Sequence, residues 1–179
     1  MNKQLTTHFN ASEFRCKCGK CEDLPPDEKL VNYLEKVYEY LNETRDGVTA
    51  IYINSGRRCP SHSLAVGGSV DDAHVRGIAA DIHAIKGDGV TPWDSHALAA
   101  VCERVGFSGI GIITEIDVHA DVRTSANYKN AHWFGDERTG NNNIMSFSDY
   151  LPDKKGKTIT VKHKITVLYD GEKIFEKEI

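Results

Sequence analysis

The stretch "SVDDAHVRGIAAD" (residues 69–81) places a histidine, His74, in a polar run and a carboxylate, Asp81, at the end of a short apolar segment. It leads into "GIAADIHAI" (77–85), whose composition and length predict a β-strand. Because side chains alternate along a strand, its two faces carry Ala79, Asp81 and His83 on one side and Ile78, Ala80 and Ile82 on the other. An acid on an otherwise apolar strand marks this stretch as a candidate site.

A second strand is predicted at "EIDVHADVR" (115–123), where apolar and polar residues alternate more cleanly than in the preceding sequence. The apolar face carries Ile116, Val118, Ala120 and Val122, and the polar face carries Glu115, Asp117, His119, Asp121 and Arg123. A polar strand face usually points to bulk water. Carboxylates, an imidazole and a guanidinium on one face could equally line a reaction cleft.

These two strands could bring His74, Asp81 and His119 together if they run side by side. Two imidazoles and a carboxylate are sufficient ligands for a catalytic zinc ion, with a fourth position left open for water. The small residues around Asp81 would let the chain pass close to such an ion. The alternative is that these histidines, like most of the eight in the chain, are surface or hydrogen-bonded residues.

Further elements follow from periodicity and turn residues. Long helices are predicted at 25–43 and 91–107, a strand at 48–56 and one short helix within 57–68. In the second long helix, Thr91 is the expected N-cap, Pro92 fits the first turn and Gly106 can end the helix.

The C-terminal part of the chain predicts an added hairpin. Residues 124–150 are predicted to be loop, and residues 158–179 alternate around Asp170-Gly171, a strong signal for a two-residue hairpin turn. The segment "DKKGKTITVKHK" (153–164) carries five lysines, Lys154, Lys155, Lys157, Lys162 and Lys164. They either discourage edge-to-edge pairing of a solvated strand or attract an anionic polymer.

Composition bounds the class of protein. The 179 residues carry a formal net charge of −4 and are 40% hydrophobic, which suits one domain with a small appendage. The mild acidity argues against nucleic-acid binding, and no apolar run approaches the about 20 residues that span a membrane. The opening "MNKQLTTHFNASEF" lacks the apolar stretch of a secretory signal. We therefore expect a monomer that is synthesised in the cytoplasm and needs help to leave it.

The cysteines are Cys16, Cys18, Cys21, Cys59 and Cys102. An odd number without a secretory signal argues against a full disulfide framework. The first three could hold a second, structural zinc ion together with His8 or Cys59. Their spacing is not the usual pair of Cys-x-x-Cys motifs, so the sequence favours reduced, partly buried thiols. A disulfide from Cys16 or Cys18 to Cys59 requires that the protein act outside the cell.

"HVRGIAAD" followed by "HADVR" resembles the zinc peptidase family of bacterial D-alanyl-D-alanine carboxypeptidases and peptidoglycan L,D-endopeptidases, to which hedgehog signalling domains are distant structural relatives. The family signature runs Ser-x-His-x-x-Gly-x-Ala-x-Asp, followed by a later His that often lies in His-x-Asp. "HFNASEF" with "CKCG" resembles the opening of the phage-associated branch, and "INSGRRCPSH" resembles its Ser-Gly-Tyr-Arg-x-Pro-x-His segment. The resemblance covers roughly residues 7–135.

The resemblance implies roles for particular residues. The implied zinc ligands are His74, Asp81 and His119. A carboxylate must take a proton from water and pass it to the leaving amine. The His-x-Asp pattern favours Asp121, relatives with the acid before the histidine keep Asp117 open, and the unused aspartate could orient a ligand. Arg58 matches the family arginine that faces the substrate and can stabilise oxyanion charge; the alternative is a surface arginine in a salt bridge.

Two positions depart from the family pattern. Asp72 stands where the family has the Ser before the first ligand, and Arg57 stands where it has Tyr in Ser-Gly-Tyr-Arg. Neither departure removes a ligand. Both could change the substrate preference or the surroundings of the metal.

We therefore expect an α+β fold of the hedgehog and D-Ala-D-Ala-peptidase type, with helices packed on a mostly antiparallel sheet. Residues 1–150 would form the zinc peptidase domain, and residues 151–179 a β-hairpin packed on that domain. The expected activity is hydrolysis in the stem peptide or cross-bridge of peptidoglycan. The enzyme would act on the cell wall after release, as a phage or prophage lysis enzyme, or as part of a virion. The alternatives are a non-catalytic zinc-binding module of the same fold and a zinc-ribbon-like interaction protein built on the cysteines.

Overall fold

The computed structural model describes residues 3–126, 128, 130–156, 164–169 and 172–178. Its main body is a five-stranded sheet in the order β1-β2-β4-β3-β5. The strands are β1 (Ala50–Ser55), β2 (Ala79–Ile85), β3 (Gly109–Ile112), β4 (Val118–Asp121) and β5 (Trp133–Asp136). All neighbouring pairs are antiparallel except β3 and β5. The prediction of an α+β fold with a mostly antiparallel sheet is therefore confirmed.

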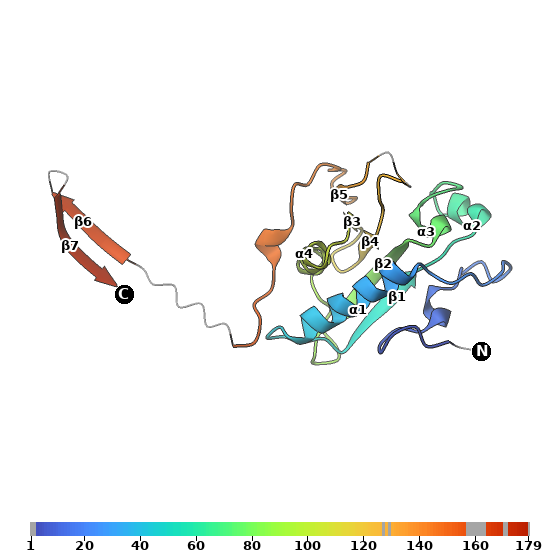
Figure 1. The fold of residues 1–179 in the computed structure, drawn as a ribbon, viewed down its shortest axis with the longest axis horizontal. Helices are drawn as coiled ribbons and strands as arrows, with labels where there is room; N and C mark the ends of the chain where they lie inside the picture. Colours follow the sequence, from blue (N-terminus) through green and yellow to red (C-terminus); the bar gives the residue numbers. More distant parts are fainter. Residues whose placement is uncertain (1–2, 127, 129, 157–163, 170–171, 179) are drawn as a thin grey trace.

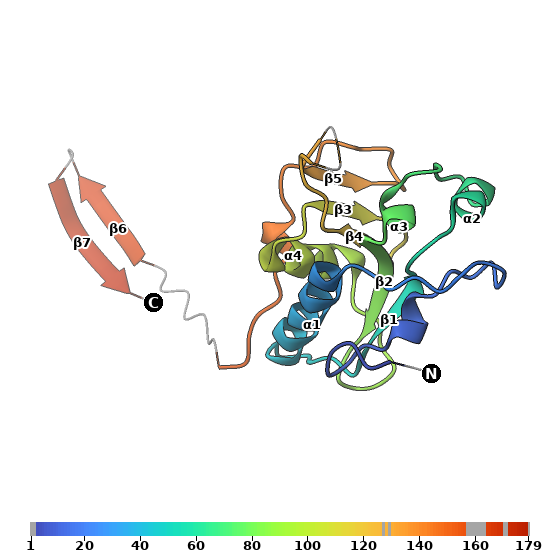
Figure 2. The same cartoon turned by 45° about the vertical axis from the view of Figure 1, so that its right-hand side comes forward.

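Two long helices lie on one face of this sheet (Figures 1 and 2). The helix α4 (Ser95–Val105) packs on β2, β3 and β4, and α1 (Glu28–Asn42) packs against α4. The side chains that form this core include Leu30, Leu34, Leu41, Ile82, Leu98, Val101, Ile110, Ile112 and Val118. Because strand side chains alternate, the next residues along β2 and β4, Asp81 and His119, face away from the helices. The sheet thus has one apolar face, which the helices cover, and an opposite face that carries the polar side chains of Asp81 and His119.

Shorter elements lie around the C-terminal end of β1 and the N-terminal end of β2 (Figure 1). They are the 3₁₀-helix η1 (Ala11–Phe14) and the short helices α2 (Pro60–Ala65) and α3 (Ala73–Arg76). A second 3₁₀-helix, η2 (Ser148–Tyr150), lies elsewhere and packs against α4. The short helix predicted within 57–68 is α2. The polar run before β2, for which no helix was predicted, forms α3. Its N-cap is Asp72, and Gly77 ends it with φ +77°.

Three predicted features of the elements are wrong. The strand predicted at 115–123 is only β4, because the chain bends over 114–116 and the N–H of Asp117 donates to Thr114 Oγ1 at 3.0 Å. The loop predicted at 124–150 contains β5, which pairs with β3. The helix predicted from residue 91 begins at Ser95. Its N-cap is Asp94 rather than Thr91, since Asp94 Oδ1 accepts from the N–H of His96 at 2.9 Å.

We expect Asp94→Ala to lower the free energy of unfolding by about 1 kcal/mol, because two N–H groups of the first turn lose their acceptor. Thr91→Ala is the matched control. The Thr91 hydroxyl donates to Asp88 in an exposed turn and caps no helix, so its loss should cost less. Urea unfolding of the full chain measures both values. A larger loss for Thr91→Ala would contradict the observed cap.

The C-terminal strands β6 (Lys164–Tyr169) and β7 (Glu172–Glu178) form a separate antiparallel pair. The predicted turn Asp170-Gly171, and also Lys157 and Lys162, lie outside the described residues. The packing of this hairpin on residues 1–150 stays a prediction. Before the hairpin, Lys154 forms an ion pair with Glu43 at the end of α1, at 2.6 Å. In the part of the chain that the structure describes, no helix has both the length and the apolar character needed to cross a membrane.

Candidate metal centre

A hydrogen bond to the backbone fixes the orientation of the His74 ring. It lies in α3, is only 4% exposed, and its Nδ1 lies 2.7 Å from the carbonyl oxygen of Gly56. A carbonyl can only accept, so Nδ1 carries the proton and donates it to Gly56. The other ring nitrogen, Nε2, therefore presents a lone pair toward β2 and β4.

His119 is fixed in the same way by its own strand. Its Nε2 lies 3.1 Å from Asp121 Oδ2, and Asp121 is in turn held by Arg123, whose Nε lies 2.8 Å from Asp121 Oδ1. Asp121 is completely buried. Nε2 of His119 thus donates to the carboxylate, which turns Nδ1 toward the neighbouring strand. Outer hydrogen bonds of this kind orient histidines that bind metal ions.

Asp81 lies directly opposite His119 in the β2–β4 register. Its Oδ1 is 2.9 Å from His119 Nδ1 and 3.2 Å from His74 Nε2, and these two nitrogens are 3.2 Å apart. Tetrahedral zinc with ligands at about 2.1 Å holds its donor atoms roughly 3.4 Å from one another. The three atoms are therefore spaced as zinc ligands are, and the structure brings together all three residues predicted for this role.

The charges around His74, Asp81 and His119 favour a cation between these three side chains. Burial alone would raise the pKa of Asp81, but above all the hydrogen bond with His119 holds that pKa well below its usual range. Burial alone would lower the pKa of His119, but its hydrogen bonds to Asp121 and Asp81 raise that pKa to about 9. The carboxylate and the two imidazole nitrogens that face one another thus favour a positive charge between them, which a bound metal ion would supply.

The group opens into a cleft of about 530 Å³. Its walls include His74, Asp81, His119, Arg58, Trp133 and Glu137. The rings of Trp133 and His119 meet at an interplanar angle of 70°, with ring centroids 6.3 Å apart. Because three protein atoms converge at one wall, a bound ion would have its remaining coordination position on the cleft side. Water and a substrate carbonyl could reach that position.

Arg58 lies within this site rather than on the open surface. Its Nη2 donates to Asp81 Oδ2 at 2.7 Å and its Nε donates to Ser55 Oγ at 2.9 Å. Arg58 forms a salt bridge with Asp81 and also lines the cleft, and its action on a substrate stays a prediction. The carboxylate of Asp81 is thus held on one oxygen by Arg58, with the other oxygen facing the two histidines.

The two departures from the family pattern have structural contacts. Asp72 caps α3 by accepting from the N–H of Val75 at 2.9 Å and also accepts from Ser63 Oγ. Arg57 donates through Nη2 to the carbonyl of Val75 at 3.0 Å. Both residues therefore hold the short helix that carries His74 and, in this structure, act on its backbone.

The two candidate acids occupy different surroundings. Asp121 is buried behind His119 and does not line the cleft. Asp117 is partly exposed and lines a neighbouring cleft of about 540 Å³, together with Asp81. It accepts from Asn54 Nδ2 at 2.6 Å and from Thr114 Oγ1 at 2.6 Å. Sequence reasoning missed Trp133 and Glu137, because both lie in a segment predicted as loop.

Comparison with known proteins agrees with this geometry. A family model described as Peptidase M15 matches residues 7–121, which is more than half of the chain and includes all three residues of the metal group. The searches of curated proteins and of solved structures found no match.

Proposed function

This chain belongs to the peptidase M15 family, whose members are zinc peptidases, and from that premise we propose that it hydrolyses peptide bonds in the peptide part of peptidoglycan. The observation that carries the proposal is the convergence of His74 Nε2, Asp81 Oδ1 and His119 Nδ1 at the wall of an open cleft. Each histidine has its outer nitrogen engaged, so only the inner nitrogens are free to bind the ion.

Zinc, when bound, lowers the pKa of a bound water and polarises the scissile carbonyl. The residues of the chain supply the rest. Gly56 and Asp121 keep the two imidazoles in the tautomers that face the ion. Arg58 holds Asp81 and presents its guanidinium at the cleft, where it can stabilise negative charge that develops on the substrate oxygen.

A proton must pass from water to the leaving amine, and a carboxylate oxygen is the group that can carry it. We assign this step to Asp117, and we assign to Asp121 the positioning of His119. The contacts of Asp121 support this division, because its carboxylate is buried and engaged by His119 and Arg123. Asp117 lines an open cleft together with the ligand Asp81.

The charges around the cleft support a substrate with a carboxylate close to the scissile bond. Arg58 and Arg123 place two guanidinium groups among the cleft residues. Stem peptides of peptidoglycan end in such a carboxylate. We further propose that the enzyme acts on the wall as a phage or prophage lysis enzyme or as a wall-penetrating enzyme of a virion, which the sequence resemblance supports.

Purified peptidoglycan is the substrate that tests this function. We expect the zinc-loaded full chain to release peptide fragments, a strong chelator to reduce release to the level of a protein-free control, and added zinc to restore it. Mass spectrometry of the fragments identifies the bond that is cut. Zinc-loaded protein that binds walls without releasing fragments would contradict the proposal and would indicate a non-catalytic binding module.

A further inference from the structure

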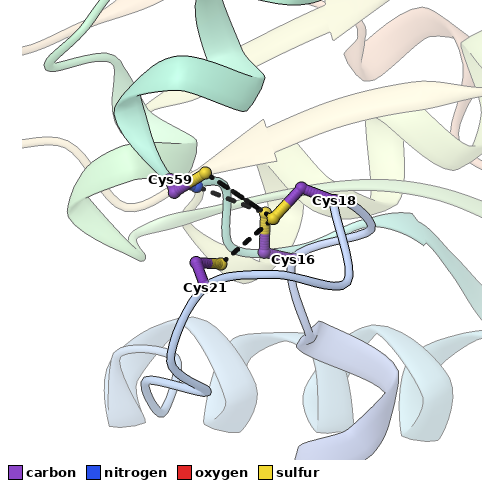
Figure 3. A group of neighbouring side chains, drawn as sticks. All are labelled: Cys16, Cys18, Cys21 and Cys59. Atoms are coloured by element: carbon purple, nitrogen blue, oxygen red, sulfur yellow. Dashed lines mark hydrogen bonds between the residues drawn. The ribbon is translucent and has the colours of Figure 1, made fainter.

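Four cysteine side chains meet at the start of α2, outside the cleft that holds the histidines (Figure 3). Cys16, Cys18 and Cys21 lie in one loop, and Cys59 is the residue before the first turn of α2. All four sulfur atoms lie within 4.8 Å of one another. Because Cys59 is distant from the others in sequence, only the folded chain completes the group.

The sulfur–sulfur distances fit one shared metal ion. Zinc bound to four thiolates at about 2.3 Å holds the sulfurs roughly 3.8 Å apart. The Sγ atom of Cys59 lies 3.7 Å from that of Cys18 and 3.9 Å from that of Cys16, and Cys18 and Cys21 are 3.4 Å apart. A disulfide needs about 2.05 Å, and all four residues are free thiols in this structure. The spacing matches a tetrahedral group and does not match two bonded pairs.

The surroundings suit thiolates. The N–H of Cys59 donates to Cys16 Sγ at 3.3 Å, and the N–H of Lys20 donates to Cys18 Sγ at 3.4 Å. Such hydrogen bonds favour the charged form of an acceptor. Gly19 turns the loop between Cys18 and Cys21 with φ +65°, a conformation that glycine adopts at little cost. The side chain of Arg57 lines the same pocket as Cys16, Cys21 and Cys59 and can offset the negative charge of a zinc ion with four thiolates.

We propose that Cys16, Cys18, Cys21 and Cys59 bind a structural zinc ion, separate from the ion of the histidine group. Four protein ligands leave no position for water, as in other structural zinc sites. Binding releases the thiol protons to solvent. His8, which the sequence offered as a fourth ligand, is engaged elsewhere: its Nδ1 lies 2.6 Å from Glu35 Oε1, and its ring stacks on Tyr38.

This zinc site would fasten the N-terminal segment to the turn that supplies Arg58. The segment is already packed there: Phe14 is fully buried, and its carbonyl accepts from the N–H of Arg57 at 2.8 Å. At Gly56 a Cβ atom would lie 2.6 Å from the Cα of Phe14, so the two backbones are in direct contact. Cys59 follows Arg58 immediately, and the bound ion would therefore fix the backbone on the side of Arg58 away from β1.

The metal content of the full chain tests this proposal, measured by inductively coupled plasma mass spectrometry after expression with added zinc. The native protein should hold two zinc ions per chain. Cys18→Ser with Cys59→Ser should hold one, and His74→Ala with His119→Ala should also hold one. Cys102→Ala is the matched control, because Cys102 is buried in α4 away from the group, and it should retain two.

A second measurement does not depend on the cysteine variants being folded. Cobalt in place of zinc gives an intense thiolate-to-metal charge-transfer band only when cysteine sulfur binds it. We expect this band in the native chain and equally in the His74→Ala, His119→Ala variant. The proposal is overturned if the histidine variant binds no metal and shows no such band, or if the mass of the unreduced protein shows that these cysteines have lost hydrogens to disulfides. Zinc at the cysteines with an inactive histidine group would support this proposal and contradict only the proposed function.

Discussion

His119→Ala is expected to reduce peptide hydrolysis to the uncatalysed level and to lower the zinc content by one ion per chain. The substitution removes one of three donor atoms and leaves Asp81 facing His74 alone, at 3.2 Å. Two ligands hold an open zinc site too weakly to keep it filled, since such sites generally need three protein ligands. His74→Ala should have the same effect, because its Nε2 is the donor from the opposite side.

His96→Ala is the matched control for these variants. His96 lies in the first turn of α4, where its ring contacts Tyr150. It belongs to a different element from His74, Asp81 and His119, which lie in α3, β2 and β4. It should keep full zinc content and full activity. An unchanged zinc content in a chain that carries both His74→Ala and His119→Ala would contradict the ligand assignment. Zinc must be counted per chain rather than as present or absent, because the cysteine group is expected to hold its own ion.

The sequence predicted the residues of the metal group but not the way in which they are held. Alternation along 77–85 and 115–123 is a local property, and it correctly placed Asp81 and His119 on the sheet face away from the apolar core. Which ring nitrogen of each histidine points inward depends on Gly56 and Asp121. Gly56 lies 18 residues from His74, so its carbonyl reaches the ring only after β1 and α3 have come together.

The missed strands have a different cause. β3 is "GIGI", and glycine lowers the strand signal of any short run. The glycines are there for contact: a Cβ at Gly109 would overlap the carboxylate of Asp121, and one at Gly111 would lie 2.7 Å from the Trp133 ring. β5 has four residues and pairs in parallel with β3. Pairing with β3, rather than the local sequence, determines where β5 lies, and this pairing also brings Trp133 and Glu137 to the wall of the cleft.

The cysteine group shows the same limit. Cys-x-Cys-x-x-Cys in the loop of residues 16–21 does not match a usual zinc motif, and from sequence alone reduced thiols were the favoured interpretation. The fourth sulfur comes from Cys59, across a contact that requires η1 to pack beside β1. Motif spacing is therefore a poor guide when one ligand is supplied by a distant element.

The second large effect concerns the carboxylate that moves the proton. Asp117→Asn is expected to lower kcat by about 10²- to 10⁴-fold, the usual range for loss of a positioned acid-base group, and to do so even with zinc in excess. Zinc content should be unchanged, since Asp117 contacts Asn54 and Thr114 rather than a ligand atom of the metal group.

Asp121→Asn should behave differently, and the difference distinguishes the two acids. The amide is a poorer partner for His119 Nε2 and for Arg123, so the metal affinity should fall by about 10- to 100-fold, while most of the turnover returns when zinc is in excess. Glu137→Gln is the matched control, because Glu137 is another carboxylate that lines the metal cleft, and it should keep kcat within a few-fold. The assignment reverses the order that the His-x-Asp pattern favours. It fails if the loss in Asp121→Asn persists at full zinc occupancy with the metal affinity unchanged, which would make Asp121 the base. It fails equally if Glu137→Gln shows the large loss of kcat and Asp117→Asn does not.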